Sequence, residues 1–202
     1  MRLNIQSIIT AVVLAVLASA CSSKPFLKVH YQLPSAANVI EEKKVFLTVA
    51  DVRKNDIFLS QNAKKSLKDF KGTFSLVVLN PDGSGNLVGA YKLNGLLTEI
   101  FKRRLEHIGL QVTPTLDNTD PTLQVELKEF NLDFVRRKWI VRMNYQANLT
   151  RNGQLLAKES VEGTAERLKV IGKGDAEKII GELVSDMVNK LDLSKLLQQA
   201  YR

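Results

Sequence analysis

The sequence predicts an α+β domain in which two amphipathic helices pack on one face of a mostly antiparallel sheet that contains a three-stranded meander. Three observations support this fold class. Apolar and polar residues alternate along 123–134 and 139–150, as in strands with one buried face. Apolar residues recur at helical spacing in 93–108 and 179–191. These helical segments flank the strands in the chain, an order typical of α+β sandwiches.

The first two strands of the meander are predicted to share one buried face. In the first strand the alternation slips at Lys128-Glu129, where one extra residue, a β-bulge, would restore a single apolar face. The second strand alternates without a break from Trp139 to Thr150. One face of this hairpin is therefore expected in the core and the other in water.

The turn into the third strand contains Asn152-Gly153. A two-residue turn would place Lys158 opposite the apolar residue Ala147. A three-residue loop with a left-handed glycine instead pairs Leu149 with Leu155 and keeps the apolar face together, so the sequence favours that register.

The two helices are predicted at Leu93 to Ile108 and from about Ile179 to Leu191. Each carries one apolar stripe, and Gly109 can take the left-handed turn that ends the first helix. The stripes and the meander are expected to form one core that includes Leu97, Ile100, Leu105, Val141, Met143, Leu183 and Met187.

Shorter elements complete the domain. Between residues 54 and 72 the chain is polar and rich in lysine, and one short helical turn is expected there. Residues 80–86 have the proline and glycine content of a turn. Strands are predicted at 26–33, 45–49, 74–79 and 110–112, and a last short helix at 194–201.

Residues 1–20 have the layout of a bacterial secretory signal peptide. Arg2 precedes an apolar run from Ile8 to Leu17, which is too short to span a bilayer, and small residues follow. Cys21, the only cysteine in the chain, comes next. This arrangement resembles the lipobox of bacterial lipoproteins, whose cysteine is lipidated and becomes the new N-terminus. The position three residues before the cysteine holds Ala18 in place of the usual leucine, so ordinary A-x-A cleavage is the alternative.

The signal divides the chain into three parts: the signal peptide 1–20, the lipidated cysteine and tether 21–43, and a single α+β domain 44–202. The resemblance to enterobacterial lipoproteins implies a palmitate-type lipid anchor at Cys21. It also implies retention at the outer membrane facing the periplasm, because Ser22 replaces the aspartate that holds such proteins at the inner membrane. The domain itself contains no second apolar stretch of membrane-spanning length.

The chain is basic, with a formal net charge of +8. A basic surface suits anionic partners, and secretion argues against nucleic acid. The cluster Arg136, Arg137 and Lys138, with Arg142 nearby, lies where the chain turns between two long strands. Contact with an anionic surface, either lipid or an acidic partner, is one hypothesis. The alternative is a solvated hairpin tip behind which Trp139 starts the core face.

The sequence shows no catalytic or metal-binding motif, so we expect neither an enzyme nor a cofactor. His30 and His107 have no histidine or cysteine at metal-ligand spacing. No G-x-S-x-G is present, and Asp117 and Asp120 lack the calcium-loop pattern. A soluble periplasmic binding protein, or an enzyme whose site is formed only in space, stays open as an alternative.

The order of elements resembles the YajG-like bacterial envelope lipoproteins and, more loosely, the PqiC-like auxiliary lipoproteins of lipid-transport ABC systems. The resemblance rests on apolar patterns at 96–100, 108–110 and 122–125, followed by a long hairpin and a C-terminal amphipathic helix. It implies a non-enzymatic binding or scaffolding module of the cell envelope with a protein partner. The lysine-rich insertion at 54–72 departs from that pattern.

Overall fold

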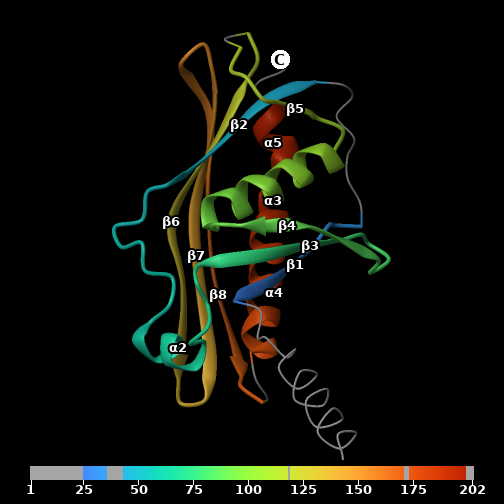
Figure 1. Cartoon of the computed structure of the whole chain (residues 1–202). Coiled ribbons are helices and arrows are strands. Elements are labelled where there is room, and N and C mark those ends of the chain that lie inside the picture. The colour runs from blue at the N-terminus through green and yellow to red at the C-terminus, as the bar shows by residue number, and fades with distance from the viewer. Residues whose placement is uncertain (1–24, 36–42, 118, 171–172, 199–202) are drawn as a thin grey trace, which may run out of the picture.

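The computed structural model describes residues 25–35, 43–117, 119–170 and 173–198, which form an α+β fold with two β-sheets (Figure 1). Within these ranges, no helix combines the length and apolar character needed to cross a bilayer. The predicted signal peptide and Cys21 lie outside the described residues.

The larger sheet contains the predicted meander. Its strand order is β5-β2-β6-β7-β8, and β6, β7 and β8 pair antiparallel. β2 runs parallel to both of its neighbours. The strands are β2 (Lys44–Asp51), β5 (Gln111–Thr113), β6 (Thr122–Val135), β7 (Lys138–Arg151) and β8 (Gln154–Leu168).

A second, three-stranded sheet corrects the sequence prediction. It consists of β1 (Phe26–Gln32), β3 (Thr73–Leu79) and β4 (Gly85–Tyr91), with β1 parallel and β4 antiparallel to β3. The prediction of one mostly antiparallel sheet is therefore wrong, because the chain forms two mixed sheets. β4 gave no alternating signal, since it carries two glycines and its pairing with β3 is interrupted by a bulge.

Two long helices lie on one face of the larger sheet, as predicted, and the smaller sheet shares their layer (Figure 1). α3 (Leu93–His107) contacts β2 and β5 as well as β3 and β4. α4 (Gly174–Lys190) contacts β7, β8 and β1. Two short helices, α2 (Gln61–Ser66) and α5 (Leu193–Gln198), complete the fold. All seven predicted core residues are buried together.

The bulge predicted in the meander is confirmed, whereas the predicted turn is wrong. Register shifts between Leu127 and Glu129, so Lys128 is the extra residue. At the other hairpin, Arg151 pairs with Gln154, so the turn has two residues and not three. A second bulge at Leu156 then restores the apolar face by pairing Leu149 with Ala157. The predicted three-residue loop and the observed bulge both keep the apolar residues on one face.

The outer edge of β1 is closed by a row of side chains from α4. The residues of this row follow at steps of four and therefore lie on one stripe of the helix. Glu177 accepts a hydrogen bond from Lys28 N, Ser185 Oγ from Gln32 N, and Asn189 Nδ2 donates to Gln32 O. Gly181 occupies the middle of the row, where an added Cβ would lie 2.7 Å from His30 O. Backbone N–H and C=O groups at this edge, which could otherwise pair with a strand of another molecule, thus form hydrogen bonds with α4.

β1 lies inside the segment 21–43 that was predicted to be the lipidated cysteine and tether. The strand predicted at 26–33 is present, and its alternate residues Leu27, Val29 and Tyr31 are fully buried. β1 is therefore part of the core.

Candidate membrane-facing site

The basic turn (Arg136, Arg137 and Lys138) ends the β6–β7 hairpin. Val135 pairs with Lys138, so the turn has two central residues, and both have a positive φ: 49° for Arg136 and 64° for Arg137. This is the backbone of a type I′ turn, which asparagine and glycine favour. A side chain such as arginine costs roughly 1–2 kcal/mol per residue in this left-handed region. The turn therefore contains residues that its backbone disfavours.

The charges of the basic turn face solvent. Arg136, Arg137 and Lys138 are all exposed. Lys138 Nζ lies 3.1 Å from Glu166 Oε2, and both side chains are about half exposed, so this pair contributes little to stability. Within the described ranges, no acidic side chain pairs with either arginine. Both guanidinium groups are thus available to an external anion.

Exposed apolar side chains surround these charges. Leu168 is paired with Lys138 in the sheet and is 61% exposed, and Val170, just beyond the end of β8, is 76% exposed. Val135 is 38% exposed. Basic and apolar groups together at one tip suit a membrane–water interface, where the charges meet headgroups and the apolar groups leave water.

Trp139 belongs to the core, as the alternative prediction of a solvated hairpin tip expected. Its side chain is fully buried, and its ring centroid lies 4.6 Å from that of Phe134. The ammonium group of Lys169 lies 4.9 Å from the Phe134 centroid and 5.7 Å from the Trp139 centroid, within cation–π range. Lys169 thus adds a further positive charge next to the basic turn.

Arg142 does not join the basic turn. It pairs with Thr164 and Asn131 in the middle of the sheet. It lies four residue steps from Lys138, which is about 14 Å along a strand. Of the four predicted contact residues, the structure therefore brings three together at the tip.

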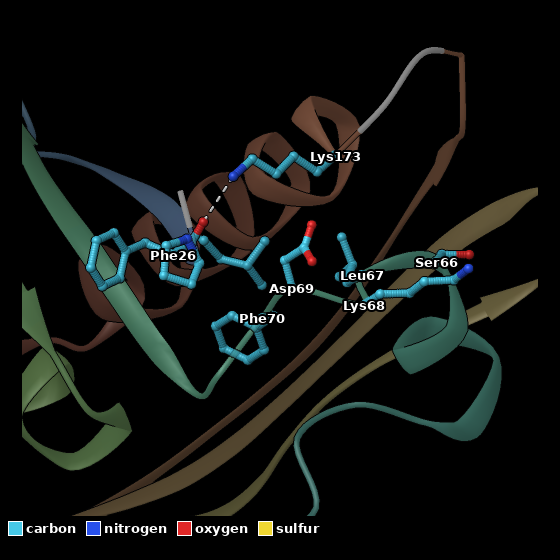
Figure 2. A pocket seen from close by; sticks show the side chains of 9 residues that line it. Phe26, Ser66, Leu67, Lys68, Asp69, Phe70 and Lys173 are labelled. Carbon is cyan, nitrogen blue, oxygen red and sulfur yellow. Dashed lines mark hydrogen bonds between the residues drawn. The ribbon is translucent and has the colours of Figure 1, made fainter. Parts of the chain in front are cut away.

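The chain enters β1 beside the start of α4, near the same end of the molecule. Lys169 N donates to Arg137 O at 2.8 Å, and Lys173 Nζ donates to Phe26 O at 3.1 Å. Figure 2 shows Phe26 and Lys173 lining one pocket together with Ser66, Leu67, Lys68, Asp69 and Phe70. Sequence reasoning missed Lys169, Lys173 and the apolar rim. The run Leu168-Lys169-Val170 before Gly172 was the signal that could have indicated them.

A charged side chain, that of Arg104, lies inside the core. Arg104 is only 9% exposed, and no hydrogen-bond partner reaches its Nε or Nη1. It lies near Tyr31, whose hydroxyl donates to Asn189 Oδ1 at 2.9 Å. Burial raises the pKa of Tyr31 and of Tyr145 above the ordinary value, so both hydroxyls are neutral donors at physiological pH.

In the described segments, no three histidine, cysteine, aspartate or glutamate side chains cluster in a way that could hold a metal ion. His107 Nε2 lies 3.0 Å from Pro34 O, and His30 lies on the exposed side of β1. Asp117 forms hydrogen bonds with Thr119, which lower the pKa of its carboxyl group. His107 and Asp117 thus form hydrogen bonds within the fold.

Comparison with known proteins gives structural similarity only. No protein-family model and no curated protein matches the chain. A crystal structure of a DUF330 protein from Xanthomonas campestris is 12% identical, covers 85% of this chain and 92% of its own, and has a TM-score of 0.50. Rare lipoprotein B from Shewanella oneidensis (10% identity, 77% and 96% coverage, TM-score 0.43) and a minor lipoprotein from Acinetobacter baumannii (10%, 78% and 96%, 0.37) are less similar. The first similarity shows that this α+β fold occurs in a solved bacterial protein.

Proposed function

We propose that this chain is a non-enzymatic lipoprotein of the bacterial cell envelope, anchored through a lipidated Cys21 at the outer membrane and facing the periplasm. The signal layout that ends in the only cysteine supports the anchor. The fold shared with a solved bacterial protein is compatible with a YajG-like or PqiC-like module. In this proposal the domain binds or scaffolds another envelope protein, with a lipid-transport system as the specific candidate.

The basic turn contacts an anionic surface in this proposal. One observation carries this part: two unpaired arginines occupy positive-φ positions that favour asparagine and glycine. Strained backbone clusters at functional sites, which makes these two arginines candidates for a functional role. Each exposed basic residue near an anionic membrane contributes about 1 kcal/mol, which salt screens. A lipid anchor would make this weak attraction effective by confining the domain near the surface.

Cell fractionation tests the anchor. Cys21→Ala should release the protein from membranes or leave it unprocessed, because no thiol remains for lipidation. A mutant that fractionates and migrates like the wild type contradicts the anchor.

Vesicle binding tests the turn separately. The mature chain with Cys21→Ser should bind anionic vesicles better than neutral ones at low salt. Arg136→Glu, Arg137→Glu and Lys138→Glu together should abolish that preference. The control reverses three exposed lysines elsewhere, Lys158, Lys190 and Lys195, so that the change in net charge is the same. Equal effects of the two triple variants would mean that net charge alone decides binding.

Crosslinking in cells followed by mass spectrometry tests the partner. An envelope protein should be recovered with the wild type. If no envelope protein is crosslinked, the scaffolding role is contradicted and only membrane attachment is left.

A further inference from the structure

The lysine-rich segment 54–72, to which the sequence assigns no role, lies beside the basic turn. Ser60 N donates to Leu132 O at 3.0 Å, and Leu132 N donates to Phe58 O at 2.7 Å. Ser60 Oγ also hydrogen-bonds the carboxylate of Asp133. Because Asp133 is only three residues before Arg136, these bonds hold the start of α2 close to the hairpin tip. Figure 1 shows α2 and the β6–β7 turn at the same, lower end of the molecule.

The segment is fixed by its own apolar residues. Ala63 of α2 and Leu67, which directly follows this helix, are buried. The ring of Phe58 packs against three others, with centroid distances of 5.0 Å to Phe130, 5.1 Å to Phe74 and 5.9 Å to Phe70. The positions of its charged residues are therefore determined by the fold.

Four lysines of this segment project into solvent. Lys64, Lys65, Lys68 and Lys71 are exposed, and none forms an ion pair with a described residue. Positive charge in the last turn of a helix is favourable, which accounts for the first two lysines. It does not account for Lys68 and Lys71, which follow the helix. Asp69 lies between these two lysines in the chain, so the four lysines outnumber the acid beside them.

The far side of the segment contacts the point where the chain enters the domain. Lys71 N donates to Pro25 O at 3.4 Å, and Lys68 and Asp69 line the pocket beside Phe26 (Figure 2). Pro25 is four residue steps from Cys21, a stretch that spans at most about 14 Å. A lipid at Cys21 would therefore keep this end of the domain close to the membrane surface.

We infer that Lys64, Lys65, Lys68 and Lys71 form a second docking element for anionic phospholipid headgroups, which acts together with the basic turn. The inference rests on the proposed lipid anchor and extends it by fixing the orientation of the domain. The end that carries α2 and the β6–β7 turn faces the bilayer, and the end that carries α5 and the β7–β8 turn points away. Each lysine near the surface strengthens binding about fivefold at low salt.

Lysine footprinting on membranes tests this orientation. The mature lipidated protein is reconstituted in vesicles of phosphatidylcholine alone or of phosphatidylcholine with phosphatidylglycerol, and lysines are acylated and quantified by mass spectrometry. Lys64, Lys65, Lys68 and Lys71 should all be protected in the anionic vesicles relative to the neutral ones, and added salt should remove the protection. Lys158 and Lys195 serve as internal controls and should react equally in both.

Charge reversal of three of these lysines distinguishes docking on lipid headgroups from attachment through the lipid anchor alone. Lys64→Glu, Lys65→Glu and Lys68→Glu together should remove the protection of Lys71 while the protein stays in the vesicle fraction through its lipid. Protein that stays in the vesicle fraction without protected lysines overturns the inference and leaves the anchor intact. Protein that fails to stay in the fraction contradicts the anchor. Protection seen in native membranes but absent from pure lipid vesicles overturns lipid as the ligand, because a protein would then cover this surface.

Discussion

The two turns of the meander have similar φ angles, but one contains residues that such a turn favours and the other contains residues that it disfavours. Asn152 and Gly153 have φ values of 53° and 75°, and Arg136 and Arg137 have 49° and 64°. The first pair is what a type I′ turn favours, whereas the second pair is disfavoured there. An added Cβ at Gly153 would meet no atom within 4 Å, so space does not distinguish the two turns. This difference is the basis of our proposal that the arginines are present for their charge.

The largest effect is expected in the core that supports both turns. Leu97 and Leu183 are buried, and replacing either with alanine should cost about 2–5 kcal/mol of unfolding free energy through lost contacts and a cavity. Denaturant unfolding measures it. Losses below about 1 kcal/mol at both positions would show that the turns are not supported by one shared core.

Alkaline pH tests two buried tyrosines, Tyr145 in the middle of β7 between the two turns and Tyr31 in β1. Burial raises the pKa of Tyr31 and Tyr145, so the folded state holds their protons more tightly than the unfolded state. Their contribution is complete below the unfolded pKa of about 10 and is lost as pH rises above it. Unfolding free energy should then fall by about 1.4 kcal/mol per pH unit for each tyrosine.

Tyr145→Phe is the control for that measurement. It removes the hydroxyl that donates to Met187 O and should weaken the pH dependence above pH 10. An unchanged pH dependence would assign the alkaline loss to other groups.

Exchanging the turn sequences tests the comparison directly. Arg136→Asn with Arg137→Gly should stabilise the protein by about 1–2 kcal/mol, because the left-handed backbone loses its penalty, and should weaken binding to anionic vesicles. Asn152→Arg with Gly153→Arg should destabilise by a similar amount. If the first exchange lowers stability, the arginines are present for the fold and the comparison fails.

The smallest effect is expected at the ion pair beside the basic turn. Lys138→Ala breaks the contact with Glu166, yet stability should change by less than about 0.5 kcal/mol, because both groups are solvated. Thermal unfolding at low and high salt would measure it. A larger loss at low salt would mean that Lys138 stabilises the turn and is not free for an external anion.

Local periodicity predicted the elements whose signal lies within one segment. The meander, α3, α4, the bulge at Lys128 and the basic turn follow from alternation or helical spacing. β4 and the parallel pairs of β1 and β2 could not be predicted, because pairing partners are set by tertiary contacts. The register of β8 was wrong because a bulge at Leu156 and a longer loop have the same effect on the apolar face.

The candidate site was only partly visible for the same reason. Arg136, Arg137 and Lys138 are adjacent in sequence and were found together. The lysines of α2 reach that end of the molecule only because Ser60 bonds to Leu132, about 70 positions later. Nothing in the spacing of the lysines indicates that contact, which depends on how phenylalanines from three segments pack.

The row of α4 side chains along β1 also determines when the chain can finish folding. Hydrogen bonds between the two elements join residues 149 to 158 positions apart. Among the described elements β1 precedes every other strand, yet its outer edge is closed by α4, which follows all of the strands. Such distant contacts make folding slow. A nascent chain that has not reached Asn189 thus retains an open edge at β1, which delays commitment to the native state until α4 has been synthesised.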